Sequence, residues 1–96
     1  MIYLDNAAAT RLAPEALEAM LPFFTENYGN PGSIYSMGTA AKRAISDARE
    51  SIAESMGARA DEIYFTSGGT EADNWAIKGA AKALAGRGRH IVTTRI

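Results

Sequence analysis

The chain has 96 residues, with 10 Lys and Arg against 11 Asp and Glu, for a formal net charge of −1. This balance does not favour nucleic acid as a partner, and the absence of cysteine excludes disulfides, thiolate metal sites and cysteine nucleophiles within these residues. A hydrophobic content of 47% argues against disorder. No signal-peptide pattern is present, and no apolar stretch approaches the roughly 20 residues that span a bilayer, so we expect a cytoplasmic chain without a membrane partner.

The N-terminal segment predicts a turn followed by a helix. "MIYLDNAAAT" opens with a short apolar run that ends at Asp5 and Asn6, whose side chains tend to bond their own backbone in turns. A helix is expected from Ala13, since Pro14 suits a first helical turn. Apolar residues then recur at spacings of three and four, which indicates one apolar helix face. Pro22 lies inside this pattern and should kink or split the helix.

A turn cluster separates this helix from a longer one. Gly29, Pro31 and Gly32 in "ENYGNPGS" should stop the first helix. The second helix is predicted from about Ser36 to Met56, with Gly57 closing it as a left-handed cap. Its expected buried stripe consists of Ala41, Ile45, Ala48, Ile52 and Met56.

The C-terminal third predicts a strand, a helix and a second strand. "EIYFTS" is apolar and rich in strand formers, which indicates a buried strand, and "HIVTTRI" indicates another. A helix from about Thr70 to Leu84 lies between them. The fold class is therefore expected to be α/β, with one βαβ unit of parallel strands preceded by two helices. Because so few strands leave sheet edges unpaired, we expect these residues to be the beginning of something larger.

The loop "TSGGTEAD" lies where the first predicted strand becomes a helix. The first amides of a helix lack partners and its dipole is positive there, while glycines let an anion approach closely. Thr70 adds a hydroxyl donor, and Ser67 is a second candidate. These features indicate a phosphate-binding loop, with a plain strand-to-helix turn as the open alternative. A Walker loop is excluded because Gly69 stands where its lysine is needed, and the dinucleotide fingerprint G-x-G-x-x-G is absent.

Four segments occur in an order and at separations that resemble the N-terminal part of cysteine desulfurases of the NifS/IscS type. They are "YLDNAAAT", "YGNPGS", "EIYFTSGGTEADNWAIKGAA" and "GRHIVTT". Cysteine desulfurases belong to the class V aminotransferase family and use pyridoxal 5′-phosphate. The resemblance implies the aspartate-aminotransferase-like (fold type I) architecture. Residues 1–96 would be its N-terminal fragment, with about 1–20 in a small-domain segment and about 21–96 as the start of the large cofactor-binding domain.

The resemblance also implies a reaction and its partners. The enzymes convert L-cysteine to L-alanine and an enzyme-bound persulfide, as homodimers that supply sulfur to iron–sulfur cluster assembly. The substrate would be L-cysteine, and a scaffold or sulfur-acceptor protein would be the partner. Two alternatives stay open: a non-catalytic fragment of the same fold that acts as a binding or dimerisation module, and another enzyme of the class V family.

Three residues take site roles from the resemblance. The position of Gly69 gives a backbone amide to the cofactor phosphate, and the position of Thr70 gives an amide and a hydroxyl. The position of Asn30 lies close to the substrate carboxylate. Two departures from the run NPSSxH that many relatives carry, Gly32 and Tyr35, leave the subgroup open.

The residues that perform the chemistry in relatives come after the position of Ile96. They are the histidine that stacks on the pyridoxal ring, the aspartate of the pyridine nitrogen, the Schiff-base lysine and the cysteine nucleophile. We therefore expect no catalytic residue and no metal ligand in this fragment, and we expect it to be inactive by itself. The three lysines on predicted helices, Lys42, Lys78 and Lys82, are not expected to replace the missing one.

Three further residues are expected to have structural roles and not to bind a ligand. His90 is the only histidine and is expected at the surface. Trp75 is expected to pack in a core or an interface rather than on a cofactor. Glu71 would repel a nearby phosphate, so we expect its side chain to turn toward a neighbouring loop or subunit.

Overall fold

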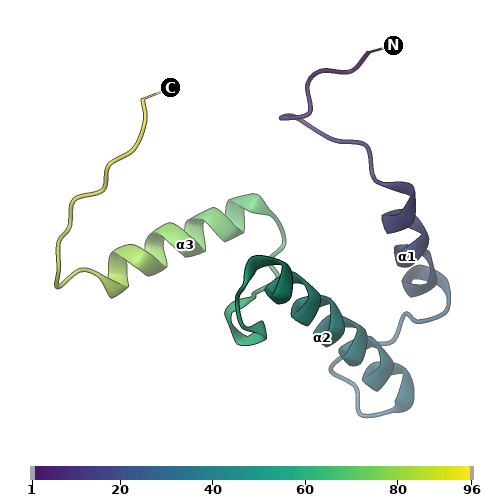
Figure 1. Ribbon diagram of the computed structural model, residues 1–96. Helices are drawn as coiled ribbons and strands as arrows, with labels where there is room; N and C mark the ends of the chain where they lie inside the picture. Colours follow the sequence, from purple (N-terminus) through teal and green to yellow (C-terminus); the bar gives the residue numbers. More distant parts are fainter. Residues whose placement is uncertain (1, 96) are drawn as a thin grey trace. The chain divides into compact units, whose positions relative to one another are not determined.

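The computed structural model describes residues 2–95, and three α helices dominate them. They are α1 (Pro14–Thr25), α2 (Ser36–Met56) and α3 (Gly69–Ala83), with the 3₁₀ helix η1 (Ala60–Glu62) after α2 (Figure 1). The chain divides into two compact units, Met1–Ile63 with α1, α2 and η1, and Tyr64–Ile96 with α3. No helix in the described part is both long enough and apolar enough to cross a membrane. The predicted domain boundary near residue 20 stays a prediction.

Helix α1 begins where the sequence predicted, with Pro14 in its first turn and Glu15 beside the positive end of its dipole. Pro22 lies inside the helix but does not split it, because the helix runs on to Thr25. The carbonyl of Pro22 accepts hydrogen bonds from the amides of Glu26 at 2.9 Å and Asn27 at 2.7 Å. These two bonds satisfy a carbonyl at the end of the helix and stop it there.

Helix α2 ends in the left-handed cap that the sequence predicted. Gly57 has φ 66° and ψ 28°, a region that favours glycine because a Cβ would crowd the backbone. The amide of Gly57 donates to the carbonyl of Glu54 at 3.2 Å, and the amide of Ala58 donates to that of Ala53 at 2.9 Å. This pair of bonds is a Schellman motif, and it satisfies carbonyls that the helix itself cannot.

The predicted buried stripe on α2 is only partly correct. Ala41 is buried, but Ile45 and Ile52 are each 38% exposed and Met56 is 70% exposed. The other buried positions of α2 are Gly38 and Ala53, which are small like Ala41. The periodicity identified the apolar face of the helix, but burial also needs a second element, and little of the described chain covers that face.

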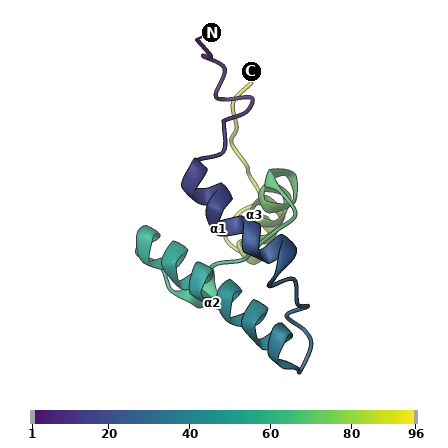
Figure 2. The same cartoon turned by 90° about the vertical axis from the view of Figure 1, so that its right-hand side faces the viewer.

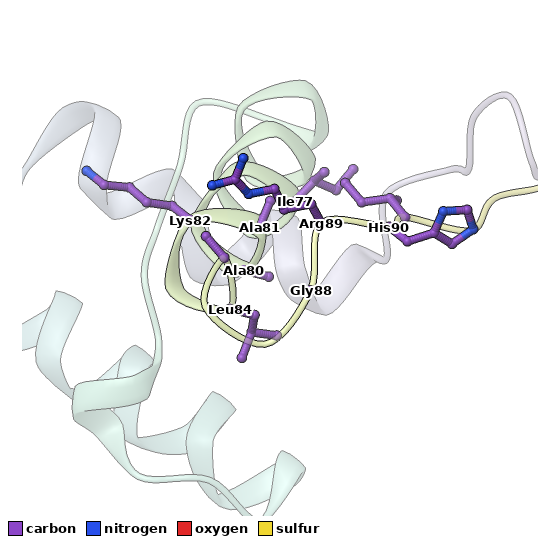
Figure 3. A pocket seen from close by; sticks show the side chains of 10 residues that line it. Ile77, Ala80, Ala81, Lys82, Leu84, Gly88, Arg89 and His90 are labelled. Carbon is purple, nitrogen blue, oxygen red and sulfur yellow. The ribbon is translucent and has the colours of Figure 1, made fainter.

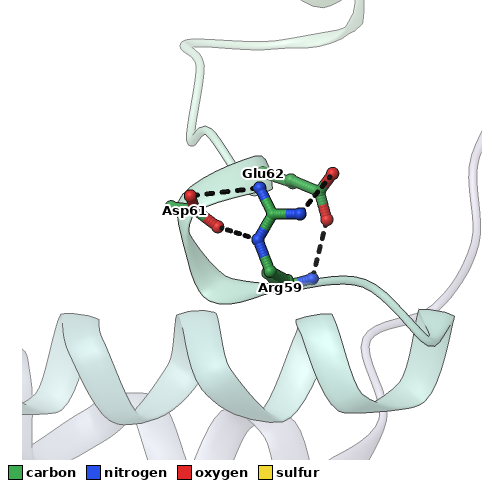
Figure 4. Close-up of polar contacts among 3 residues, drawn as sticks. All are labelled: Arg59, Asp61 and Glu62. Atoms are coloured by element: carbon green, nitrogen blue, oxygen red, sulfur yellow. Dashed lines mark hydrogen bonds and ion pairs between the residues drawn. The ribbon is translucent and has the colours of Figure 1, made fainter.

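The short helix η1 packs against α2 (Figure 2). A hydrogen bond of 3.2 Å from Nε of Arg49 to the carbonyl of Ile63 ties the end of this turn to α2. Figure 4 shows how the turn holds its own shape: the amide of Arg59 donates to Oε2 of Glu62 at 2.9 Å, and its Nε donates to Oδ1 of Asp61 at 2.9 Å. The side chains of Arg59 and Asp61 are both 71% exposed, so their ion pair fixes geometry more than it adds stability.

The predicted α/β class with a βαβ unit is wrong for this chain, because residues 2–95 form no strand. The two helices expected before the unit, and the helix expected within it, are present. Ile63 has φ −101° and ψ 124°, so its backbone has the extended conformation that the predicted strand requires. A strand also needs a ladder partner, and the segments predicted as buried strands are exposed, with Tyr64 at 65% and Val92 at 83%.

Gly38 lets the turn before α2 approach the helix closely. A Cβ at Gly38 would lie 2.6 Å from the carbonyl oxygens of both Asn30 and Ser33, which is too close for any side chain. The turn is closed by a hydrogen bond of 2.9 Å from the amide of Ser33 to the carbonyl of Asn30. Glycine at this position therefore holds the backbone around Asn30 against α2.

We predict that Gly38→Ala opens this turn. Overpacking of this kind costs about 1–3 kcal/mol, so hydrogen exchange of the Ser33 amide should accelerate by roughly 5- to 150-fold. Gly79→Ala is the matched control, because the nearest atom to its new Cβ is 3.9 Å away and alanine favours the helix. Unchanged exchange at Ser33 in Gly38→Ala would show that the turn does not depend on this close approach.

Candidate functional site

The start of α3 leaves backbone donors without acceptors. The residue before the helix, Gly68, is extended and has no side chain that could cap it. The first helical hydrogen bond runs from the amide of Ala72 to the carbonyl of Gly68 at 3.1 Å. Within residues 2–95 the amides of Gly69 and Thr70 have no hydrogen-bond acceptor. These two donors lie at the positive end of the helix dipole, where an anion is stabilised.

The glycines keep this end of the helix open. A Cβ built at Gly68 or Gly69 would meet no atom within 4 Å. The space where side chains would stand at these two positions is therefore open, and an anion could approach the backbone more closely than beside a residue with a Cβ. Of the predicted site residues, the structure brings Gly69 and Thr70 together in the first turn of one helix.

Glu71 bonds to the loop before the helix, as the sequence predicted. Its Oε2 accepts a hydrogen bond of 2.7 Å from the amide of Ser67 and another of 2.6 Å from the hydroxyl of Ser67. The Ser67 hydroxyl is thus engaged by Glu71 and is not the second phosphate donor that the sequence suggested. The spacing of four residues is one longer than in the S/T-x-x-E capping box, and the familiar pattern therefore missed this pair.

The pKa of Glu71 is lowered from its ordinary value, chiefly by the hydrogen bond from the Ser67 hydroxyl and further by the one from the Ser67 amide. Both bonds are donated to the charged form of the carboxylate and favour it. The Glu71 carboxylate is therefore favoured in its charged form, and its Oε2 is bonded to Ser67 in the loop before the helix.

Two more hydrogen bonds shape the loop. The hydroxyl of Thr66 donates to the carbonyl of Gly68 at 3.1 Å, and the side-chain amide of Asn74 donates to the carbonyl of Thr70 at 2.9 Å. Both acceptors are carbonyls, so neither bond uses the free amides. The hydroxyl of Thr70 itself has no partner among the described residues and stays available as a donor.

Trp75 packs on an aromatic ring of the segment before the loop. The ring centroids of Trp75 and Tyr64 lie 5.1 Å apart with an interplanar angle of 60°, a favourable tilted arrangement. Trp75 is 53% exposed, so it is neither fully buried nor free. The predicted packing role fits this contact, which stabilises the approach of the chain to α3.

Asn30, the predicted substrate-binding residue, lies in the other compact unit. Its Oδ1 accepts a hydrogen bond of 2.8 Å from the amide of Gly32, which forms a local side-chain turn. Its carbonyl accepts from the amide of Ser33 at 2.9 Å, and its side-chain NH₂ has no partner in the described chain. A site that Asn30 shares with Gly69 and Thr70 stays a prediction.

A hollow of about 680 Å³ lies over the second half of α3 and the chain after it (Figure 3). Ile77 and Leu84 contribute to its mostly apolar lining, and the side chains of Lys82 and His90 point away from each other. His90 is exposed, as predicted. None of the predicted site residues lines this hollow, so it is separate from the candidate phosphate site.

The chain is similar over almost all of its length to known proteins. The family model for class V aminotransferases matches residues 2–96. The chain is 56% identical over 95 residues to "Cysteine desulfurase IscS" of Methanosarcina thermophila and 57% identical over 96 residues to "Cysteine desulfurase" of Cereibacter sphaeroides. It covers 24% of the length of each of these relatives and 99% of its own. A solved "NIFS-LIKE PROTEIN" matches 90% of the chain with a TM-score of 0.81 and 42% identity.

We predict that Ser67→Ala raises the pKa of Glu71 toward its ordinary value, because it removes the stronger of the two hydrogen bonds to the carboxylate. Since the pKa is lowered in the folded chain, the interaction stabilises the loop at neutral pH. It is lost as the pH falls through the lowered pKa of Glu71. A side-chain carboxyl titration by NMR measures the change.

Ser51→Ala is the control for this titration, because Ser51 is exposed on α2 and makes no hydrogen bond to Glu71. It should leave the pKa of Glu71 unchanged. Identical titration curves for Ser67→Ala and the parent chain would contradict the assigned cause of the shift.

Proposed function

The chain belongs to the class V aminotransferase family, and on this premise we propose that it forms the phosphate-binding part of a pyridoxal-phosphate-dependent cysteine desulfurase. The enzyme transfers sulfur from L-cysteine to the thiol of an enzyme cysteine, which becomes a persulfide, and releases L-alanine. The relatives named as cysteine desulfurases support this choice within the family. The chain has no cysteine, so the proposal places the persulfide-bearing residue outside these 96 residues.

The observation that carries the proposal is the pair of free amides beside the free hydroxyl at the start of α3. A phosphate monoester is a dianion or nearly so at neutral pH, and its oxygens accept several charge-assisted hydrogen bonds. The amide of Gly69 and the amide and hydroxyl of Thr70 supply three such donors in one helical turn. No atom lies within 4 Å of a Cβ built at Gly68 or Gly69, and the carboxylate of Glu71 accepts its hydrogen bonds from Ser67 and not from these amides. The residues present therefore fit the cofactor phosphate.

Pyridoxal phosphate, when bound, supplies an electron sink for a carbanion formed on the amino acid substrate. The chain's own residues would anchor the cofactor and orient the substrate. Gly69 and Thr70 fix the phosphate end of the cofactor, which sets the direction of its ring. Asn30 donates its side-chain NH₂ to the substrate carboxylate, and the hydrogen bond from Gly32 to its oxygen fixes which way that NH₂ points.

The proposal extends to the setting of the enzyme. We assign it to the cytoplasm as a homodimer that passes sulfur to an iron–sulfur scaffold or another acceptor protein. The relatives named as cysteine desulfurases support the part of this proposal that concerns sulfur transfer. The assignment of Gly69, Thr70 and Asn30 to binding leaves the proton transfers and the sulfur transfer to residues outside this chain.

We predict that Thr70→Val weakens binding of pyridoxal 5′-phosphate to the full chain, measured by phosphorus NMR titration. The variant keeps the shape and the amide but loses a charge-assisted hydrogen bond worth about 1.5–3 kcal/mol, which corresponds to a roughly 10- to 150-fold weaker affinity.

Two variants control this measurement. Thr70→Ser retains the hydroxyl and should bind within a few-fold of the parent chain. Thr39→Val makes the same chemical change on α2, where the hydroxyl donates to the carbonyl of Tyr35 at 3.4 Å, and should not alter binding. Equal affinity of Thr70→Val and Thr70→Ser would refute the role of the hydroxyl.

A further inference from the structure

An acidic residue in the first turn of α3 presents a problem for any anion site there. A glutamate at the third position of a helix commonly folds back and accepts a hydrogen bond from the amide before the helix. The positive end of the dipole also attracts its carboxylate. Glu71 occupies this position, so it is the natural competitor of a phosphate for the amides that start α3.

In the structure Glu71 bonds one residue before the position expected for a capping box, to the amide of Ser67 instead of the amide of Gly68. Oε2 of Glu71 accepts two hydrogen bonds from Ser67, at 2.7 Å from its amide and at 2.6 Å from its hydroxyl, and none from the amides of Gly69 and Thr70. Two donors from one residue converge on one oxygen, and this fixes the carboxylate more firmly than a single bond. The carboxylate is thereby committed to the loop and leaves the two helix amides free.

The same contact determines the path of the loop. Ser67 is linked to Glu71 across four residues, and the residue between Ser67 and the helix, Gly68, has its carbonyl bonded by Thr66 at 3.1 Å and by the amide of Ala72 at 3.1 Å. The loop is closed at both ends without using the amides of Gly69 or Thr70. Loss of the Glu71 acceptor would release the Ser67 end, because the Ser67 amide and hydroxyl have no other partner among the described residues.

We propose that Glu71 is a positioning residue for the anion site: its carboxylate oxygen holds Ser67 so that the amides of Gly69 and Thr70 stay open to a phosphate. This role rests on the proposed phosphate function of Gly69 and Thr70. Glu71 does not touch the anion. Its negative charge opposes anion binding, while its hydrogen-bond geometry favours it, and the two effects can be separated by substitution.

The test compares Glu71→Gln with Glu71→Ala in the full chain, with inorganic phosphate and pyridoxal 5′-phosphate as separate probes. Glutamine keeps an oxygen that can accept both Ser67 hydrogen bonds and removes the charge, so it should bind both probes as tightly as the parent chain or a few-fold more tightly. Alanine removes the acceptor together with the charge and should bind at least five-fold more weakly. Phosphorus NMR measures both affinities.

Hydrogen exchange of the Ser67 amide provides the second readout. Exchange should stay slow in Glu71→Gln and accelerate in Glu71→Ala. Equal affinities of the two variants would overturn the proposal, because Glu71 would then act through its charge alone. Weak binding in both variants would also overturn it, since the charge and not the acceptor geometry would be required.

The outcome is distinguishable from a failure of the proposed function. If the parent chain binds neither probe, the phosphate role of Gly69 and Thr70 fails, and the exchange of the Ser67 amide alone decides whether Glu71 holds the loop. Protection in the parent chain and in Glu71→Gln, with loss in Glu71→Ala, supports that role. Equal protection in all three chains overturns it.

Discussion

The first amides of a helix cannot be satisfied inside the helix, and α1, η1 and α3 meet that constraint differently. Helix α1 places Pro14 in its first turn and so has one donor fewer. The short turn η1 bonds the amide before it to Glu62. Helix α3 leaves the amides of Gly69 and Thr70 open within the described residues, although Ser67 and Glu71 lie beside them. The side chains that could cap this helix are bonded to each other, so its first amides are left to water or to a ligand.

The parts of the structure that depend on near neighbours followed from the sequence. The start of α1, both ends of α2, the left-handed cap at Gly57 and the start of α3 within one residue were predicted from prolines, glycines and apolar periodicity. The end of α1 at Thr25 was not, because the sequence placed the stop at the turn that begins with Gly29. The strands could not be predicted in this way. Extended preference is local and is present at Ile63, but a ladder is made with another segment, and no such pairing occurs within residues 2–95. The buried stripe of α2 was overestimated for the same reason.

In the candidate site, too, some features followed from the sequence and others did not. The start of α3 and the bonding of Glu71 to a neighbouring loop were predictable, because both depend on residues that lie close in sequence. The choice of Ser67 as the partner of Glu71 was not, since a spacing of four differs from the capping box by one residue. Local physics also left a phosphate loop and a plain turn equally open. The family relationship favours the loop, and it does so through residues spread over the whole chain.

The exposed apolar side chains of this chain have a thermodynamic consequence. Leu4 is 87% exposed, Ile34 is 99% exposed and Val92 is 83% exposed, so unfolding uncovers little further apolar surface at these positions. The heat capacity change of unfolding scales with that surface and will be small, and the transition will resemble a helix–coil equilibrium more than a cooperative melt. A helix of 15 residues such as α3 is marginal by itself in water. An anion that binds only the formed helix therefore shifts its population directly, and occupancy of the site and helicity of α3 become two measures of one equilibrium.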